Sequence, residues 1–479
     1  MRSDVIIEEM MTKIKHHLQN HADHLNAALT APHAQVVTRC IMVAVMEAAV
    51  AGFKTYIQEN EIRENTIIHA GQKYQFNRTS SKEFSTLFGK SAFERRLYQN
   101  DDGESFVPLD HAWNMEGQFA TIEVREAVLF ALSLMPACEA RQVFDKCATF
   151  QLAESSFKKI AENMESYLED NMDNLLETIR EEEVIPLEEV KVIAVSEDGA
   201  NVLLQEPGKK KGRKRQRPGE RKQATEGEFD SPTSYKNAVV GSVSLDGDVP
   251  ADEKAPLRLQ SRYVARMPED RALTLKAQLQ KEVESTLKRL PASVVKVFVS
   301  DAATGIRKEI DTNPLFEDFE KIIDFFHTTE HLSNAAEAIF GQGDPEGKKW
   351  YESKKRVLLE EDDGAEEVYR SLLYYQKNYK DPKERQRSLA CELKFFRNNK
   401  SRMEYKRFRD NGWPIGSGVI EAACKSIVKC RLCRSGMRWT RTGGQTILTL
   451  RSLVKSSRWD AFWTKYKTTH VAKNHNTAT

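Results

Sequence analysis

The sequence predicts an α/β protein built around a mixed five-stranded sheet, with an all-helical insertion and a mainly helical N-terminal region. Two apolar runs of strand length, 191–199 and 294–301, each carry an aspartate at or near the end. An amphipathic pattern over 269–290 predicts a helix between these strands. From 332 to 410 the chain is polar, charged and helix-favouring, which predicts a helical insertion.

Residues 1–118 form the predicted N-terminal region, which is helical at first and then contains short strands. Apolar residues recur at helical spacing through residue 60. Within them, the run Ile41–Phe53 is too short to span a bilayer and contains Glu47, so we expect a buried helix and no membrane contact. Short strands are expected around 86–90 and 93–98.

Residues 119–189 return to helical periodicity, and we interpret them as a DNA-binding region that resembles a helix-turn-helix. Helical stretches at 140–147 and 148–160 are joined by a short turn. Any two helices joined in this way have the same pattern, so a purely structural helical pair remains the alternative.

The middle of the chain follows the strand order of an RNase H-like domain. The predicted elements, in order, are strands at 191–199, 235–245 and 258–267, a helix at 269–290, a strand at 294–301, and a short strand or helix start at 320–326. The insertion divides this domain into a first part at 190–331 and a last part, with basic helices, at 411–467. Residues 468–479 are expected to be a disordered tail.

Composition favours a protein of a reducing compartment with a local site for a polyanion. Seven cysteines in 479 residues is an odd and sparse set, which predicts free thiols. Without a positively charged and then apolar leader, we expect the bacterial cytoplasm, near the nucleoid. The net charge is only +1, but from Cys391 onward 19 Lys or Arg face five Asp or Glu.

Basic side chains gather in a loop at 209–222 and in the C-terminal part. Nine cations in 14 residues exceed what solubility requires, so we expect phosphate contacts there, although a solvated loop is the simpler alternative. Arginines that alternate with tryptophans, up to Arg451 and Arg458, are further candidates. The residues predicted to contact DNA are Lys209, Lys210, Lys211, Arg213, Lys214, Arg215, Arg217, Lys425, Lys429, Arg431, Arg434 and Arg438.

Three acids are the candidate catalytic residues: Asp198, Asp301 and Glu421. Alternation places Asp198 on the same face as Ala194 and Ser196, places Asp301 on the face of Val297 and Val299, and turns Glu197 to the opposite face. Three acids that meet can hold two divalent cations, and two cations can drive in-line attack on a phosphodiester. Each aspartate taken alone is also explained as a cap or turn residue.

Glu421 follows the glycine-rich segment 416–418, in which Ser417 is predicted to cap the next helix. Acids favour the first turn of a helix for electrostatic reasons alone, which is the simpler account of Glu421. Lys425 and Lys429 follow at i+4 and i+8, on the same predicted face.

Two other patterns suggest zinc. His327, Glu330 and His331 match the H-x-x-E-H pattern of inverted zinc peptidases, but no third ligand motif follows. Cys430 and Cys433, with Cys424 upstream, form half of a zinc site, and free thiols on a helix are the simpler interpretation.

The C-terminal motifs resemble those of bacterial insertion-sequence DDE transposases, most closely the Kra type, with Mutator-like elements as more distant relatives. The resemblance covers about 190–465 and is weaker over 80–165. It rests on the motifs Ser196-Glu-Asp198-Gly199, Val299-Ser-Asp301, Trp413-Pro-Ile-Gly-Ser-Gly-Val-Ile-Glu421, Ser435-Gly-Met-Arg-Trp439 and Ser457-Arg-Trp-Asp-Ala-Phe-Trp463.

This resemblance implies an activity, a cofactor and partners. Asp198, Asp301 and Glu421 become a DDE triad that holds two Mg²⁺ or Mn²⁺ ions, supported by Asp324 and His327. The partners become the terminal inverted repeats and target DNA, bound by a homodimer or a larger synaptic assembly. The cysteine-rich knuckle of many members has no counterpart near residues 99–103. A domesticated, non-catalytic DNA-binding protein and an RNase H-type nuclease remain alternatives.

Overall fold

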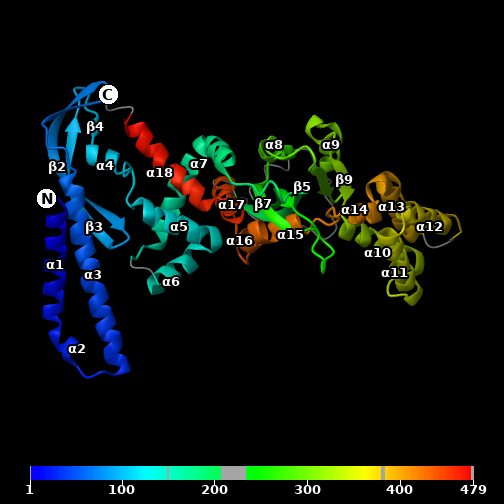
Figure 1. The fold of residues 1–479 in the computed structure, drawn as a ribbon, viewed down its shortest axis with the longest axis horizontal. Coiled ribbons are helices and arrows are strands. Elements are labelled where there is room, and N and C mark those ends of the chain that lie inside the picture. Colours follow the sequence, from blue (N-terminus) through cyan, green and yellow to red (C-terminus); the bar gives the residue numbers. More distant parts are fainter. Residues whose placement is uncertain (1, 148–149, 206–232, 379–382, 476–479) are drawn as a thin grey trace, which may run out of the picture. The chain divides into compact units, whose positions relative to one another are not determined.

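The computed structural model describes residues 2–147, 150–205, 233–378 and 383–475 (Figure 1). The chain forms two compact units. Met1–Asn171 and Asp460–Thr479 make up the first unit, and Met172–Trp459 make up the second. The predicted division into six segments remains a prediction.

The first unit begins with a helical hairpin, as the sequence predicts. Its helices are α1 (Arg2–Asn20), α2 (Ala22–Asn26) and α3 (Ala31–Glu59). The hydroxyl of Thr30 caps α3 by accepting a hydrogen bond from the His33 amide at 3.3 Å, and a proline occupies its first turn. Helices α1 and α3 pack against each other along the hairpin.

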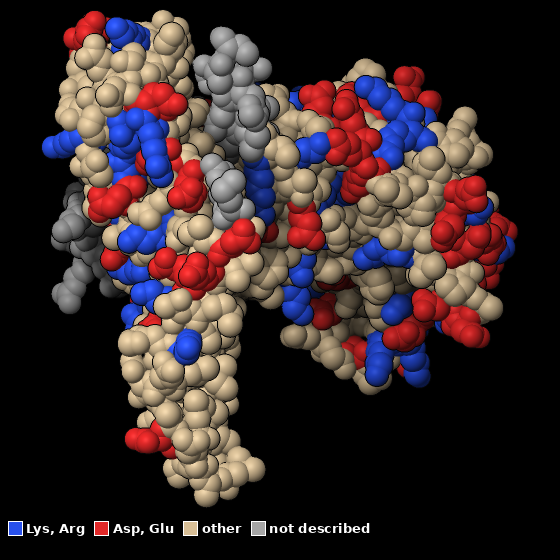
Figure 2. All heavy atoms as spheres, turned by 60° about the vertical axis from the view of Figure 1, so that its left-hand side comes forward, with Lys and Arg blue, Asp and Glu red and all other residues tan. Residues whose placement is uncertain are grey.

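The prediction that the apolar run of α3 is buried is wrong in part. Ile41 and Val45 are 47% and 49% exposed, whereas Ala44 and Ala48 are buried. Few charged side chains lie on the visible face of this hairpin (Figure 2). By length and composition α3 could cross a membrane, although the core helix of a soluble protein passes the same test.

A four-stranded antiparallel sheet follows the hairpin. Its strands are β1 (Thr66–His69), β2 (Gln72–Thr86), β3 (Gly89–Gln99) and β4 (Ser105–Phe106), in that order. The predicted strand at 86–90 is instead the turn between β2 and β3, because Thr86 pairs with Gly89. The sequence of β2 is mostly polar, so its pattern did not predict a strand. The last residues of β2, Phe84 among them, are buried.

Helices complete the first unit. They are α4 (Pro108–Ala112), α5 (Ile122–Leu134), α6 (Ala137–Cys147), α7 (Glu154–Glu182), which extends into the second unit, and α18 (Trp459–His475). The two helices of the predicted helix-turn-helix are therefore α6 and α7. Helix α18 reaches His475, so the prediction of a disordered tail from residue 468 is wrong as far as His475. Its Tyr466 is buried and accepts a 2.9 Å hydrogen bond from Arg125.

The second unit is built on the predicted mixed five-stranded sheet. Its strands are β5 (Val192–Gln205), β6 (Thr233–Asp246), β7 (Arg258–Arg266), β8 (Val295–Ser300) and β9 (Glu320–Ile323). Their spatial order is β7-β6-β5-β8-β9. The first three strands form an antiparallel meander, and β8 and β9 extend the sheet in parallel from β5.

Both faces of this sheet are buried. Ile193, Val195 and Phe298 belong to a core that includes α8 (Leu273–Leu287) and α9 (Thr304–Thr312). Val297 and Val299 face a second core on the opposite side. Because side chains alternate, Asp198 falls on the side of the second core and Glu197 on the side of the first.

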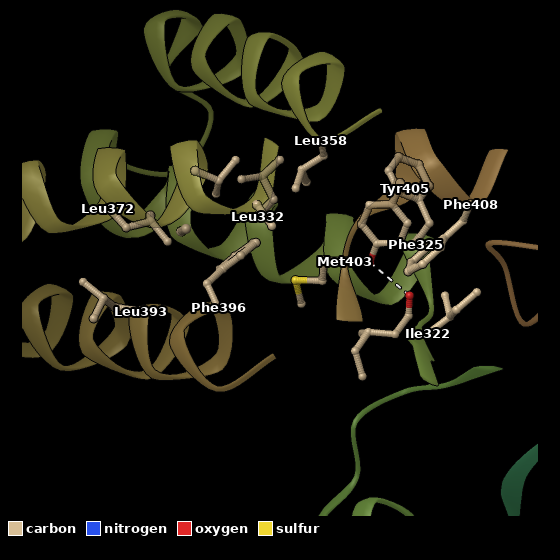
Figure 3. Close-up of a cluster of buried hydrophobic side chains, with 14 of the residues drawn as sticks. Ile322, Phe325, Leu332, Leu358, Leu372, Leu393, Phe396, Met403, Tyr405 and Phe408 are labelled. Carbon is tan, nitrogen blue, oxygen red and sulfur yellow. Dashed lines mark hydrogen bonds between the residues drawn. The ribbon is translucent and has the colours of Figure 1, made fainter. Parts of the chain in front are cut away.

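The region 332–410 is helical, as the residue pattern predicts. It contains most of α10 (Phe325–Phe340), then α11 (Pro345–Glu360), α12 (Gly364–Asn378), α13 (Lys383–Asn399) and α14 (Tyr405–Asp410). The second core continues from the sheet into these helices through Leu332, Leu372 and Phe396 (Figure 3). The Tyr405 hydroxyl donates a 3.0 Å hydrogen bond to the Ile323 carbonyl, which joins the helices to β9.

A buried ion-pair network ties α7, α8 and the end of the second unit together. Glu282 accepts hydrogen bonds from Arg180 at 2.8 Å and from Arg458 at 2.9 Å. Arg458 also bonds Glu183, which in turn pairs with Arg262. The sequence suggested Arg458 and Arg451 as DNA contacts. Both are buried, because the exposed fraction is only 3% for Arg458 and 5% for Arg451.

We expect Glu282→Ala to reduce the free energy of unfolding by about 3–5 kcal/mol, because it leaves two buried arginines without their shared carboxylate. Urea unfolding measures the loss. The matched control is Asp173→Ala, whose partner Lys281 lies 2.9 Å away and is half exposed. That variant is expected to lose less than about 1 kcal/mol. Equal losses would contradict the role of burial.

Asp246 predicts a pH dependence of stability. Burial raises the pKa of Asp246 to about 6, against the lowering effect of Arg258. A raised folded-state pKa means that the folded state holds the proton more tightly, so this group costs stability as the pH rises from about 4 through 6. Asp246→Asn removes that cost. In urea unfolding, the free energy of unfolding of the Asp246→Asn protein should exceed that of the parent by about 2–3 kcal/mol at pH 7.5 and by little at pH 4. The exposed Asp248→Asn is the control, with no difference between the two pH values.

Candidate active site

Asp198 and Asp301 lie side by side because β5 and β8 pair in parallel. Ser196 pairs with Val299, and each aspartate follows two residues after its member of this pair. Neighbouring strands are about 4.8 Å apart, so the same step along both strands brings the two carboxylates together. The predicted end of the first strand at residue 199 is wrong, because β5 continues to Gln205, whereas β8 ends at Ser300 as expected.

Each aspartate also accepts a hydrogen bond from a nearby backbone amide. Asp198 Oδ1 accepts a 2.6 Å hydrogen bond from the Gly199 amide, and Asp301 Oδ1 accepts one of 2.9 Å from the Ala303 amide. The interpretation as a turn residue is compatible with Asp301, which follows the end of β8, and is wrong for Asp198, which lies inside β5. It does not explain why two such acids occupy matching positions on adjacent strands.

The acids concentrate negative charge. Burial raises the pKa of Asp198, and the neighbouring Asp301 raises it further, against the lowering effects of the Gly199 amide and Lys429. Burial also raises the pKa of Glu197, on the opposite face, to about 7. A bound cation would favour the charged form of such carboxylates, so this electrostatic arrangement suits cation binding.

Glu421 approaches from a different element. It lies in α15 (Gly418–Ala423), which continues into a π-helical turn (Cys424–Lys429) and α16 (Cys430–Leu432). Helix α15 packs on β5 and β6. The predicted side-chain cap by Ser417 is wrong, because its hydroxyl instead donates a 2.9 Å hydrogen bond to the carboxylate of Glu421. This bond fixes the orientation of the Glu421 side chain.

Asp198 and Glu421 line one pocket of about 700 Å³. Lys425 and Lys429 line the same pocket, as their predicted position on the Glu421 face requires. Cys424 is also in the lining, and burial followed by the charge of Asp198 raises the pKa of its thiol. The pocket therefore combines two carboxylates and two ammonium groups.

The three acids are not gathered around one point. Within the described parts of the chain, their oxygens do not form a group with all members within 4.8 Å of one another. Two metal ions in such sites lie about 3.5–4 Å apart, so the outer two carboxylates need not touch. Asp198, which adjoins Asp301 and shares the pocket of Glu421, has the central position.

Asp324 holds the segment that carries Glu421. Its side chain is buried, and Oδ1 accepts a 2.6 Å hydrogen bond from the His327 amide at the start of α10. Its Oδ2 accepts a second hydrogen bond from the Ser417 amide. Beside it, the Phe325 amide donates to the Ile415 carbonyl at 2.9 Å. Asp324 is thus a positioning residue for the loop that precedes α15.

His327 and His331 occupy one face of α10. Their Nε2 atoms are 3.3 Å apart, and Nδ1 of His331 lies 2.6 Å from Glu392. Glu330 faces Nδ1 of His327 at 3.4 Å. Among the residues that the structure describes, these side chains belong to no group of three metal ligands. The histidine pair instead links α10 to α13, where His331 stacks on Phe395.

The predicted DNA contacts divide into three groups. Residues 209–217 lie outside the described residues. Lys425, Lys429, Arg434 and Arg438 are exposed. Arg431 corrects the prediction, because it is only 3% exposed and its guanidinium lies 5.0 Å from the centre of the Trp439 ring. Such a side chain contributes to packing and does not present its charge to a phosphate.

Sequence reasoning missed the contacts that hold the acids. Cys424 was considered as a zinc ligand, whereas it lines the pocket of Asp198 and Glu421. Its position three residues after Glu421, on the same helix face, was the available signal. No local signal could have shown that Asp324 bonds Ser417, because 93 residues separate them.

Comparisons with known proteins add little. No protein-family model matches the chain, and no curated protein matches it. A structural neighbour is a chain of the "Drosophila P element transposase strand transfer complex", with 12% sequence identity over 74% of this chain and 84% of that chain. The TM-score is 0.26, which is too low to show a shared fold.

We expect Asp324→Asn to release the loop before α15, because the amide nitrogen that replaces one oxygen would face the Ser417 N–H. Losing a buried hydrogen bond to a charged group costs about 1–3 kcal/mol, so amide hydrogen exchange over 415–421 should accelerate about tenfold or more. The control is Asp344→Asn, at a similar cap whose bonds stay within α11. Unchanged exchange over 415–421 in the Asp324 variant would refute the positioning role.

Proposed function

We propose that the chain is a DDE transposase of an insertion sequence, with Asp198, Asp301 and Glu421 as its catalytic acids. The observation that carries this proposal is the position of two aspartates at matching points of adjacent parallel segments, each two residues beyond the Ser196–Val299 pair of β5 and β8, where Asp198 shares a pocket with Glu421 and two lysines. The strand order β7-β6-β5-β8-β9 supports it, since this is the order expected of an RNase H-like domain. The resemblance of the sequence motifs to Kra-type transposases supports it further.

The donor set fits two Mg²⁺ or Mn²⁺ ions, because hard divalent cations prefer carboxylate oxygens. Asp198, Asp301 and Glu421 would hold these ions. When bound, the ions activate the attacking oxygen and stabilise the leaving oxygen of a phosphodiester.

The chain's own residues prepare this site. The Ser417 hydroxyl bonds Glu421, and Cys424 lines the same pocket as Asp198. Lys425 and Lys429 offset charge on the DNA phosphate as negative charge grows in the transition state. Asp324 keeps the Glu421 segment against the end of β9. The attacking group is water in strand cleavage and a freed 3′-hydroxyl in strand transfer.

The partners follow from this activity. The substrates are the terminal inverted repeats of the element and a target DNA, and the exposed basic side chains beside the pocket are suited to backbone phosphates. Joining two ends requires at least a homodimer. The helical pair α6 and α7 is the candidate for end recognition, and the bacterial nucleoid is the expected location.

The alternatives explain less of the structure. A domesticated DNA-binding protein has no need for three converging acids. A zinc peptidase needs a third ligand beside His327 and His331, and none completes a group of three there within the described ranges. An RNase H-type nuclease would use the same acids, and it differs only in lacking the joining step.

Substitution of the acids tests the proposal. With DNA that carries the segments flanking the gene, Asp198→Asn, Asp301→Asn and Glu421→Gln should each lower Mg²⁺-dependent cleavage and strand transfer by about a hundredfold or more. Binding in a gel-shift assay should persist. The control is Asp270→Asn, an exposed acid of the same unit. Normal cleavage by any one triad variant would remove that residue from the site. Cleavage by the parent without strand transfer would identify a nuclease.

A further inference from the structure

The helical hairpin of the first unit contains a second cluster of metal-ligating side chains. One ligand atom each from His17, His21 and Cys40 lie within 4.8 Å of one another. His17 is in α1, His21 directly follows it, and Cys40 is in α3. The cluster therefore joins the two long helices of the hairpin.

In both imidazoles the hydrogen bond involves Nδ1, so Nε2 is the nitrogen that remains to bind a metal. Nδ1 of His17 lies 2.9 Å from the carboxylate of Glu47. Nδ1 of His21 lies 2.9 Å from the carbonyl oxygen of His17. When Nδ1 carries the proton in such bonds, Nε2 is unprotonated and can bind a metal. A carboxylate or carbonyl that accepts from the far side of the ring is the usual support of a metal-bound histidine.

The local structure brings the ligands to one place. A spacing of four residues puts His17 and His21 on one face, and their rings stack with centroids 4.4 Å apart. The carbonyl end of α1 favours a nearby positive charge. Cys40 is only 7% exposed although its neighbours Ile41 and Met42 are about half exposed. Its thiol therefore faces α1 and not solvent.

We propose that His17, His21 and Cys40 bind one Zn²⁺ ion that fastens α1 to α3. Two imidazoles and one thiolate are the borderline and soft donors that zinc prefers, unlike the all-oxygen set at Asp198, Asp301 and Glu421. Zinc is commonly tetrahedral in proteins, so water would complete the set. Binding releases the thiol proton of Cys40 to solvent. This site does not depend on the proposed transposase activity.

The test uses the full chain, loaded with Zn²⁺, desalted and analysed for metal. The parent should retain one Zn²⁺ per chain and melt at a higher temperature with Zn²⁺ than with a chelator. Cys40→Ser and His21→Gln should weaken Zn²⁺ binding at least a hundredfold, and the exposed Glu47→Gln about tenfold to a hundredfold. Matched controls are Cys138→Ser, an exposed cysteine of the same unit, and His24→Gln.

Substitution of Co²⁺ gives a readout that needs no activity. The Co²⁺-loaded parent should show a thiolate-to-metal charge-transfer band that Cys40→Ser lacks and Cys138→Ser keeps. The absence of stoichiometric Zn²⁺ in the parent would overturn the proposal, as would undiminished binding in both Cys40→Ser and His21→Gln. If either ligand variant fails to fold, Glu47→Gln decides, since unchanged affinity in that variant contradicts the geometry.

Discussion

The parallel register between β5 and β8 is the constraint on which the proposed active site depends. A shift of one residue would turn one aspartate to the opposite face of the sheet. Buried side chains on both faces oppose such a shift, among them Ile193 on one side and Val297 on the other. Packing therefore holds Asp198 and Asp301 together even though the charge of Asp301 adds to the effect of burial in raising the pKa of Asp198. Burial of the apolar side chains thus offsets the free-energy cost of holding two like charges close together.

Glu421 is held by other means, because a long helical segment separates it from the sheet in sequence. Asp324 and Phe325 bond the backbone at Ser417 and Ile415, so the two ends of that segment meet at the edge of the sheet. Once its ends are fixed, the length of an insertion has only a weak effect on the entropy of closing it. The insertion also has its own core, which extends from the sheet through Leu332 and Phe396. The Glu421 segment can thus be placed accurately after many intervening residues.

Local patterns predicted the elements of the second unit well. Alternating residues identified β5 and β8, and helical spacing identified α8 and the helices after it. Patterns failed where burial decides the outcome. Arg431 and Arg458 have the composition of a DNA-binding surface, yet one stacks on Trp439 and the other enters a buried ion-pair network. The apolar run of α3 has the composition of a core helix, yet its large side chains at Ile41, Met42, Val43 and Val45 are exposed. No periodicity shows which partner an element will meet.

The division of the chain into units has a consequence for biosynthesis. Residues 172–459 are contiguous, whereas the first unit combines residues from both sides of them. Tyr466 of α18 contacts Arg125 and Tyr167, which precede it by about 300 residues or more. During translation the ribosome therefore delivers all of the second unit before it delivers the helix that completes the first. Helices α5 and α7 can therefore meet Tyr466 only after residues 172–459 have been synthesised.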